Sequence, residues 1–257
     1  NKTHPKDYKK ALKENPNSLI LKVHRSNFSL SGFVEEVSIK ELKIIADEFN
    51  VLLIHDLGSG LVIDRKFLEM QNISYFDKEI SVQESLEDGS DIVMFSGDKL
   101  FGSIQSGIIA GSEDIITKIK KYPLFRTFRC SPVVTYELQK TTELYLSKEE
   151  KSIPFWLFLS TSRQELDERV QNVSKQITLE HSIIEDFSLI GGGSMPDVKI
   201  PSSVISFNDK VYGKAQDMLS KLDIPIVPRI KENNLIFDLR SSFIEEDTHI
   251  IDALNTL

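Results

Sequence analysis

The chain has 257 residues, of which 40% are hydrophobic and 27% charged, so it is long enough to bury a core in one or two domains. Its formal net charge of −8 argues against non-specific nucleic-acid binding, and we expect no DNA partner. Cys130 is the only cysteine, which excludes an internal disulfide and fits a reducing, cytoplasmic setting. No apolar run approaches the roughly 20 residues of a membrane span, and the histidine spacing predicts no metal site.

Strand-like and helix-like segments alternate along the chain, which predicts an α/β fold with a mainly parallel sheet. The first part is expected to contain helices over 7–13, 38–50, 82–89, 113–121 and 132–146, and strands over 18–23, 51–56, 90–95 and 105–111. The second part is expected to contain helices over 163–177, 211–222 and 247–254, and strands over 183–190, 203–208, 226–230 and 235–239. Pro154 marks the approach to this second part, which we interpret as a small α+β domain.

The helix over 38–50 has the clearest local signals. Ser38 can cap it and Glu41 completes a capping box. Leu42, Ile45 and Phe49 recur at helical spacing, so they are expected to form the buried stripe.

A lysine follows the strand over 90–95, in the turn Ser96-Gly97-Asp98-Lys99-Leu100-Phe101-Gly102. An ammonium group between buried strands is costly to desolvate, so burial is expected to lower the pKa of Lys99 and make it a usable amine nucleophile. The alternative is a surface lysine in an ordinary loop.

A carboxylate, Asp56, ends the preceding strand and is followed by the turn Leu57-Gly58-Ser59-Gly60. An acid and a lysine at two strand ends suit pyridoxal 5'-phosphate (PLP), which binds as a lysine imine with an acidic partner on its ring nitrogen. The alternative for Asp56 is a turn or helix cap. His55 faces the opposite side of the strand and is expected to pack inside. Together, the two segments resemble the large domain of fold-type I PLP enzymes.

Seven motifs, found in one order, narrow this resemblance. They are KVHRSNF (22–28), GFVEEV (32–37), DLGSG (56–60), FSGDKLFG (95–102), RTFR (126–129), GGGSMP (191–196) and FDLR (237–240). The series is similar, nearly end to end, to bacterial selenocysteine synthase, the L-seryl-tRNA(Sec) selenium transferase family.

The resemblance implies a fold-type I PLP-dependent transferase. Residues 1–150 would be the C-terminal part of the PLP-binding large domain, and residues 151–257 the small C-terminal α+β domain. The activity implied is conversion of L-seryl-tRNA(Sec) to selenocysteinyl-tRNA(Sec), with selenophosphate as selenium donor, by β-elimination of water and addition of selenium. The family also implies a cytoplasmic homo-oligomer, a ring of dimers.

The chain begins where the middle of the family's sequence lies. A small tRNA-binding domain and the first half of the large domain are therefore expected upstream. A gene fragment, a truncated gene and a split protein all fit this pattern.

The resemblance also implies roles for individual residues. Lys99 would carry the PLP and later shuttle the substrate's α-proton, while Asp56 would pair with the ring nitrogen. Ser96 is expected to donate to the cofactor phosphate, Asn27 to hydrogen-bond the 3′-oxygen, and His24 to face the substrate. For these last three, a polar side chain satisfied locally in the fold is the alternative.

Arg126 and Arg129, three residues apart, can converge on an anion, and by resemblance they receive the phosphate end of selenophosphate. A solvated basic face is the alternative. Arg229 and Arg240 lie in or beside apolar strands of the small domain. For these two, a phosphate or ribose contact with the tRNA and a structural ion pair are both open.

Two positions depart from the family pattern. Ser103-Ile104 stand where a glycine and a proline are usual, and Ser131-Pro132 stand where an acidic residue and a lysine are usual. The run Gly191-Gly192-Gly193-Ser194 lacks the lysine and strand-to-helix context of a phosphate loop, so we expect a loop at the rim of the site.

Two rival functions stay open. One is a PLP-dependent lyase acting on a small amino acid or amino-sugar acid. The other is a non-catalytic remnant that only oligomerises with a full-length partner.

Overall fold

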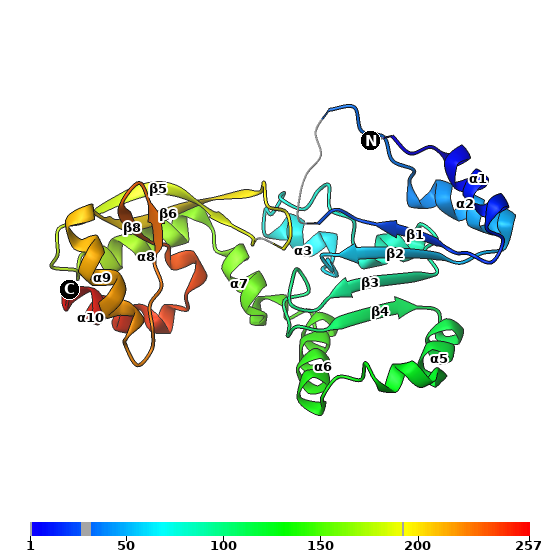
Figure 1. Ribbon diagram of the computed structural model, residues 1–257. Helices are drawn as coiled ribbons and strands as arrows, with labels where there is room; N and C mark the ends of the chain where they lie inside the picture. Colours follow the sequence, from blue (N-terminus) through cyan, green and yellow to red (C-terminus); the bar gives the residue numbers. More distant parts are fainter. Residues whose placement is uncertain (1, 27–31, 192) are drawn as a thin grey trace. The chain divides into compact units, whose positions relative to one another are not determined.

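A computed structural model of the chain describes residues 2–26, 32–191 and 193–257, with the backbone alone for residues 209–214. The chain forms two compact units. The first comprises Asn1–Phe155 and Gly191–Asp197, and the second comprises Trp156–Ile190 and Val198–Leu257 (Figure 1). Helix α7 (Pro154–Ser160) contains the point at which the first unit gives way to the second.

The first unit is built on a four-stranded sheet in the order β1-β2-β3-β4. Its strands are β1 (Ile20–Val23), β2 (Leu53–Gly58), β3 (Ile92–Ser96) and β4 (Gly107–Gly111). Strands β1, β2 and β3 run parallel, and β4 pairs antiparallel with β3. The predicted, mainly parallel sheet is therefore confirmed.

Helices connect and flank these strands. They are α1 (Pro5–Glu14), α2 (Ile39–Phe49), α3 (Arg65–Met70), α4 (Val82–Glu87), α5 (Glu113–Lys121) and α6 (Pro132–Leu146), with the 3-10 turns η1 (Pro123–Arg126) and η2 (Glu150–Ser152). The helix predicted over 132–146 is α6, residue for residue.

Helix α2 forms as its sequence indicated. The Ser38 hydroxyl accepts a hydrogen bond from the Glu41 N–H, and the Glu41 carboxylate accepts one from the Ser38 N–H at 3.0 Å. Asn50 ends the helix in the left-handed conformation, with φ of 52°. Leu42 and Ile45 are buried in a core shared with strands β1 and β2.

The two faces of the first sheet differ in exposure. Ile20 and Leu53 face the core, and both are buried. On the other face lie Leu21, Val23 and Ile109, which are 50%, 55% and 42% exposed. The register aligns Val23 with Asp56, then Met94, then Ile109, so Asp56 shares this apolar face.

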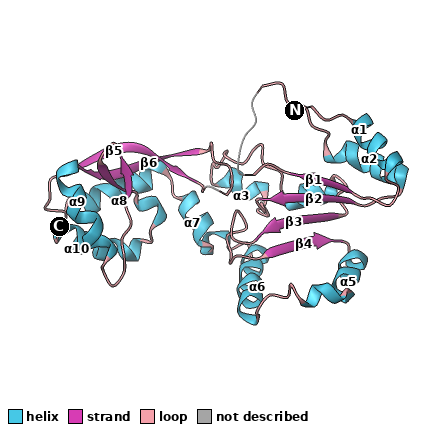
Figure 2. Ribbon diagram, in the orientation of Figure 1, coloured by secondary structure: helices cyan, strands magenta, loops and turns pink. Residues whose placement is uncertain are grey.

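The second unit is a small α+β fold (Figure 2). Its antiparallel sheet has the order β5-β6-β8-β7 and consists of β5 (Ser182–Leu189), β6 (Lys199–Phe207), β7 (Arg229–Lys231) and β8 (Asn234–Phe237). Its other elements are α8 (Arg163–Ser174), α9 (Asp209–Ser220), α10 (Asp247–Asn255), η3 (Leu239–Ser241) and η4 (Ile244–Glu246). Leu166, Val170, Phe207, Leu235 and Leu254 form the centre of one apolar cluster.

Candidate active site

The turn that carries Lys99 is held by its own backbone. The Gly97 N–H donates to the Ser106 carbonyl at 2.9 Å, and the Gly102 N–H donates to the Lys99 carbonyl at 2.9 Å. A Cβ added at Gly97 would lie 2.4 Å from the Ser106 hydroxyl oxygen, so only glycine fits there. This turn presents a half-buried Lys99 directly after β3.

The Lys99 amine lies beside two glycines. A Cβ built on Gly58 would lie 3.8 Å from Lys99 Nζ, and one built on Gly193 would lie 3.3 Å from Lys99 Cε. Gly58 also has a positive φ of 68°, which disfavours any other residue. Within the described part of the chain, Nζ has no hydrogen-bond or ion-pair partner.

Asp56 stands on the strand next to that of Lys99. It is half-buried in β2, two residues before the Gly58 that borders the lysine amine. Its carboxylate, like the amine, makes no hydrogen bond or ion pair to any residue that the structure describes. The fold therefore places the Asp56 carboxylate and the Lys99 amine at the same edge of the sheet, and neither has a polar partner among the described residues.

Two of the three other predicted cofactor residues, His24 and Ser96, lie at this edge of the sheet. His24 follows β1, and its Nε2 lies 3.3 Å from the Glu79 carboxylate. Ser96 ends β3, and its hydroxyl has no partner among residues 2–26, 32–191 and 193–257. Asn27 lies outside the described residues.

His55 packs inside, as expected. It is fully buried, and its Nδ1 lies 2.7 Å from the Ser85 hydroxyl oxygen. Burial, followed by the charges of His24 and Lys22, lowers the pKa of His55 from 6.5 to about 4. His55 is therefore neutral at pH 7.

Arg126 and Arg129 border a separate surface pocket of about 740 Å³. Both are exposed, and neither forms an ion pair within the described ranges. The pocket also includes Cys130 and three residues of the first half of α6, Pro132, Thr135 and Tyr136. Two unpaired guanidinium groups at an open pocket suit an anionic ligand.

Helix α6 connects this pocket to the lysine turn. Thr141 donates to the Ser103 hydroxyl at 2.8 Å, and Tyr145 donates its hydroxyl to the Phe101 carbonyl at 2.9 Å. Both departures from the family pattern have structural roles on this helix. Ser103 receives the Thr141 bond, while Ser131 caps α6 by accepting from the Val134 N–H at 3.4 Å.

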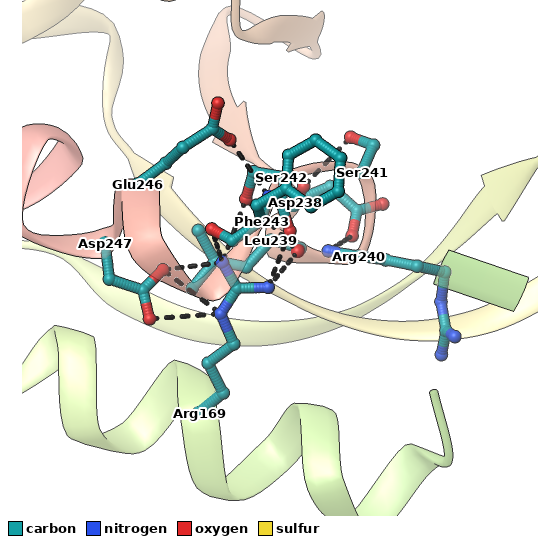
Figure 3. A network of polar contacts seen from close by, with 9 residues as sticks. All are labelled: Arg169, Asp238, Leu239, Arg240, Ser241, Ser242, Phe243, Glu246 and Asp247. Atoms are coloured by element: carbon teal, nitrogen blue, oxygen red, sulfur yellow. Dashed lines mark hydrogen bonds and ion pairs between the residues drawn. The ribbon is translucent and has the colours of Figure 1, made fainter. Parts of the chain in front are cut away.

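Arg240, in the second unit, has structural contacts. It is 5% exposed, and its guanidinium donates to backbone carbonyls. The acceptors are Phe158 (3.3 Å), Thr161 (2.7 Å) and Pro201 (2.9 Å). In Figure 3 this guanidinium points away from that of Arg169, which pairs with Asp247 at 2.6 Å. These hydrogen bonds go to carbonyl oxygens and hold Arg240 within the second unit, and an anion contact at Arg240 stays a prediction.

Arg229 forms ion pairs in the same unit. Its guanidinium lies 3.3 Å from the Asp186 carboxylate and 3.0 Å from the Asp238 carboxylate. Lys231 also pairs with Asp186, at 2.7 Å. The ion-pair alternative is thus the one seen for Arg229.

Ser26 and Glu79 had no role in the sequence-based prediction, whereas Gly193 lies in the glycine run that was expected at the rim of the site. Ser26 donates to the Gly193 carbonyl at 3.4 Å, and its own carbonyl accepts the Met195 N–H at 2.7 Å. Glu79 contacts His24, and Gly193 borders Lys99. Position 193 lies 94 residues after Lys99, so no local pattern could place it there. The one available signal was the glycine run itself.

The described residues fit PLP on their own geometry. Lys99 offers a free amine for the cofactor aldehyde, and Asp56 offers a free carboxylate for the ring nitrogen. Gly58 and Gly193 keep space open beside the amine. Among the residues described, no three His, Cys, Asp or Glu side chains gather in a way that could hold a metal ion. In that same part, no helix is long and apolar enough to span a membrane.

Comparison with known proteins shows the family. The family model for L-seryl-tRNA selenium transferase matches residues 1–243. L-seryl-tRNA(Sec) selenium transferases from Alkaliphilus oremlandii and Campylobacter lari are 38% and 35% identical to the chain. Each alignment covers 99% of this chain and 55% of the relative, so the chain spans about half the length of these proteins.

A solved structure shows the fold. D-glucosaminate-6-phosphate ammonia-lyase superimposes with a TM-score of 0.60 at 18% identity, over 100% of this chain and 61% of that one. The likeness confirms the predicted α/β class and fold-type I architecture. On its sequence and its fold, the chain belongs to the L-seryl-tRNA selenium transferase family.

Proposed function

We propose that this chain carries the cofactor lysine of a PLP-dependent selenium transferase. The whole protein would convert L-seryl-tRNA(Sec) to selenocysteinyl-tRNA(Sec). The observation that supports this most is that Lys99 follows β3 and Asp56 lies in β2, two adjacent parallel strands, and that neither side chain has a polar partner among the described residues. Membership of the family supplies the reaction class.

Each side chain has a proposed task. Lys99 Nζ binds the cofactor and afterwards moves the proton at the substrate's α-carbon, while the Asp56 carboxylate keeps the ring nitrogen protonated. When bound, the cofactor supplies an electron sink for the α-carbon. Ser96 and Asn27 would bind the cofactor oxygens, and His24 would face the substrate.

Arg126 and Arg129 are proposed to bind selenophosphate, because they are unpaired cations at an open pocket. The overall change exchanges the serine hydroxyl for selenium, and phosphate is released. We further propose that residues 1–150 belong to the cofactor domain and residues 151–257 to the small domain, apart from Gly191–Asp197, which lies within the first unit. The whole protein would work as a homo-oligomer in the cytoplasm.

Trapping of the cofactor tests this proposal. The purified chain is incubated with PLP, reduced with borohydride and digested, and the modified lysine is identified by mass spectrometry. We expect the adduct on Lys99, its loss in Lys99→Ala, and its retention in Lys120→Ala, which removes an exposed lysine of α5.

The same reaction is then repeated with the part of the Alkaliphilus oremlandii protein that this chain does not match. Failure to trap PLP on Lys99 in both settings would overturn the cofactor assignment. Release of ammonia from a small amino acid, without selenium transfer from selenophosphate to seryl-tRNA, would instead identify a lyase.

A further inference from the structure

We propose that Glu79 is a positioning residue for the lysine site, acting through the turn after β2 and through His24. Its relevance to catalysis rests on the proposed function. Its structural effect, however, can be measured without the cofactor.

Glu79 bridges two strand ends. One carboxylate oxygen accepts the Ser59 hydroxyl, and the other lies 3.3 Å from His24 Nε2. His24 directly follows β1, and Ser59 directly follows β2. Glu79 itself is 6% exposed, so it makes these contacts in the interior.

Ser59 carries the connection onward to the lysine turn. Its carbonyl accepts the Leu100 N–H at 3.0 Å, one residue after Lys99. Ser59 is fully buried and lies between Gly58, which borders the lysine amine, and Gly60. A continuous path of hydrogen bonds therefore runs from His24 through Glu79 and Ser59 to the residue beside Lys99.

The loop that carries Glu79 is held independently of the site. Arg65 donates to the Glu79 carbonyl at 2.5 Å and to the Phe76 carbonyl at 2.8 Å. The same guanidinium pairs with the Glu84 carboxylate at 2.7 Å. Arg65 thus holds the Glu79 backbone, while the Glu79 carboxylate contacts Ser59 and His24.

Removal of the Glu79 carboxylate is expected to destabilise the turn after β2, next to Lys99. Without it, the buried Ser59 hydroxyl loses its acceptor and His24 loses its neighbour. A buried donor without a partner costs about 1–3 kcal/mol, which the turn can relieve by moving. Movement of the turn shifts Lys99 relative to Asp56, and misplacement by about 1 Å can cost 100-fold in rate.

Hydrogen exchange in the cofactor-free chain is the first test. In Glu79→Ala we expect the Leu100 amide to exchange about tenfold faster than in the wild type, because the turn that accepts its bond is loosened. Glu79→Gln keeps an acceptor for Ser59, so it should restore most of the protection. Ser59→Ala combined with Glu79→Ala should exchange no faster than Glu79→Ala alone.

The matched control is Glu84→Gln. It weakens the Arg65 anchor of the same loop and leaves the Ser59 and His24 contacts in place. We expect this control to lower the free energy of unfolding without speeding exchange at Leu100. Equal exchange in Glu79→Ala and wild type would overturn the inference. Equally fast exchange at Leu100 in Glu84→Gln would also overturn it, because Glu79 would then only contribute to the general stability of the loop.

The second readout separates the two proposals. If the wild type traps PLP on Lys99, Glu79→Ala should lower the trapped fraction and Glu84→Gln should not. If the wild type traps no PLP in either setting, the proposed function fails, and exchange at Leu100 still decides the role of Glu79.

Discussion

His55 is a neutral imidazole buried in the interior of the first unit. Burial, then the charges of His24 and Lys22, lowers the pKa of His55 to about 4. The folded state therefore holds this proton less tightly than the unfolded chain, whose histidine has a pKa near 6.5. The stabilising contribution is present above pH 6.5 and is lost as the pH falls toward 4. We expect a loss of roughly 3 kcal/mol in the free energy of unfolding.

Urea unfolding of the wild type and His55→Asn, between pH 7 and pH 4, measures this contribution. Asparagine can still hydrogen-bond the Ser85 hydroxyl but does not titrate in this range. The variant should lose less stability than the wild type as the pH falls. Identical slopes for the two proteins would show that His55 does not titrate as its burial predicts.

At the scale of elements, two N-caps differ in a way that mutation can detect. The Ser38 hydroxyl accepts the Glu41 N–H at the start of α2, whereas Ser112 makes no side-chain cap bond at the start of α5. We expect Ser38→Ala to lower the free energy of unfolding by about 1 kcal/mol. Ser112→Ala should change it by less than about 0.5 kcal/mol. Urea denaturation checks both, and equal effects would contradict the role given to the Ser38 hydroxyl.

Local signals predicted some elements well and others poorly. Helices α2 and α6 have side-chain caps and clear ends, and the sequence located them closely. Strand β7 was predicted over 226–230 but forms at Arg229–Lys231, after Pro228, because proline cannot donate to a strand ladder. Helix α3 was not predicted, although α4, which is equally short, was. Gly89 follows α4 and marks its end, whereas Gln71 follows α3 and gives no such signal.

At the scale of the whole molecule, the apolar face of the first sheet should bind apolar dyes. Leu21, Val23 and Ile109 are about half exposed on it, and exposed apolar side chains on one sheet face attract such ligands. Leu21→Lys with Ile109→Lys should reduce the fluorescence of a bound anilinonaphthalene dye. Leu146→Lys, at an exposed leucine outside this face, should leave it unchanged. Equal reductions in both would contradict a site on the sheet.

The candidate site could be predicted only where one residue carried its own signal. Lys99 and Asp56 each follow an apolar strand and precede a glycine-containing turn, so both could be proposed from the sequence. Glu79 could not, because its position depends on a loop that returns from elsewhere in the chain. The glycine run that contains Gly193 was expected at the rim of the site, but no signal in the sequence indicated that Gly193 borders Lys99. For Arg240 the sequence left the role open. It could not distinguish a buried guanidinium that donates to carbonyls from one that binds a ligand.

The chain passes between its two units three times, because Gly191–Asp197 belongs to the first unit although strands on both sides of it belong to the second. Residues 156–257 therefore cannot be removed without also removing part of the first unit. A cut after Phe155 would delete Gly193 from beside Lys99 and Met195 from its bond to Ser26. Exchange of residues 156–257 between relatives would replace part of the lysine's surroundings as well, because Gly191–Asp197 lies within that stretch of sequence.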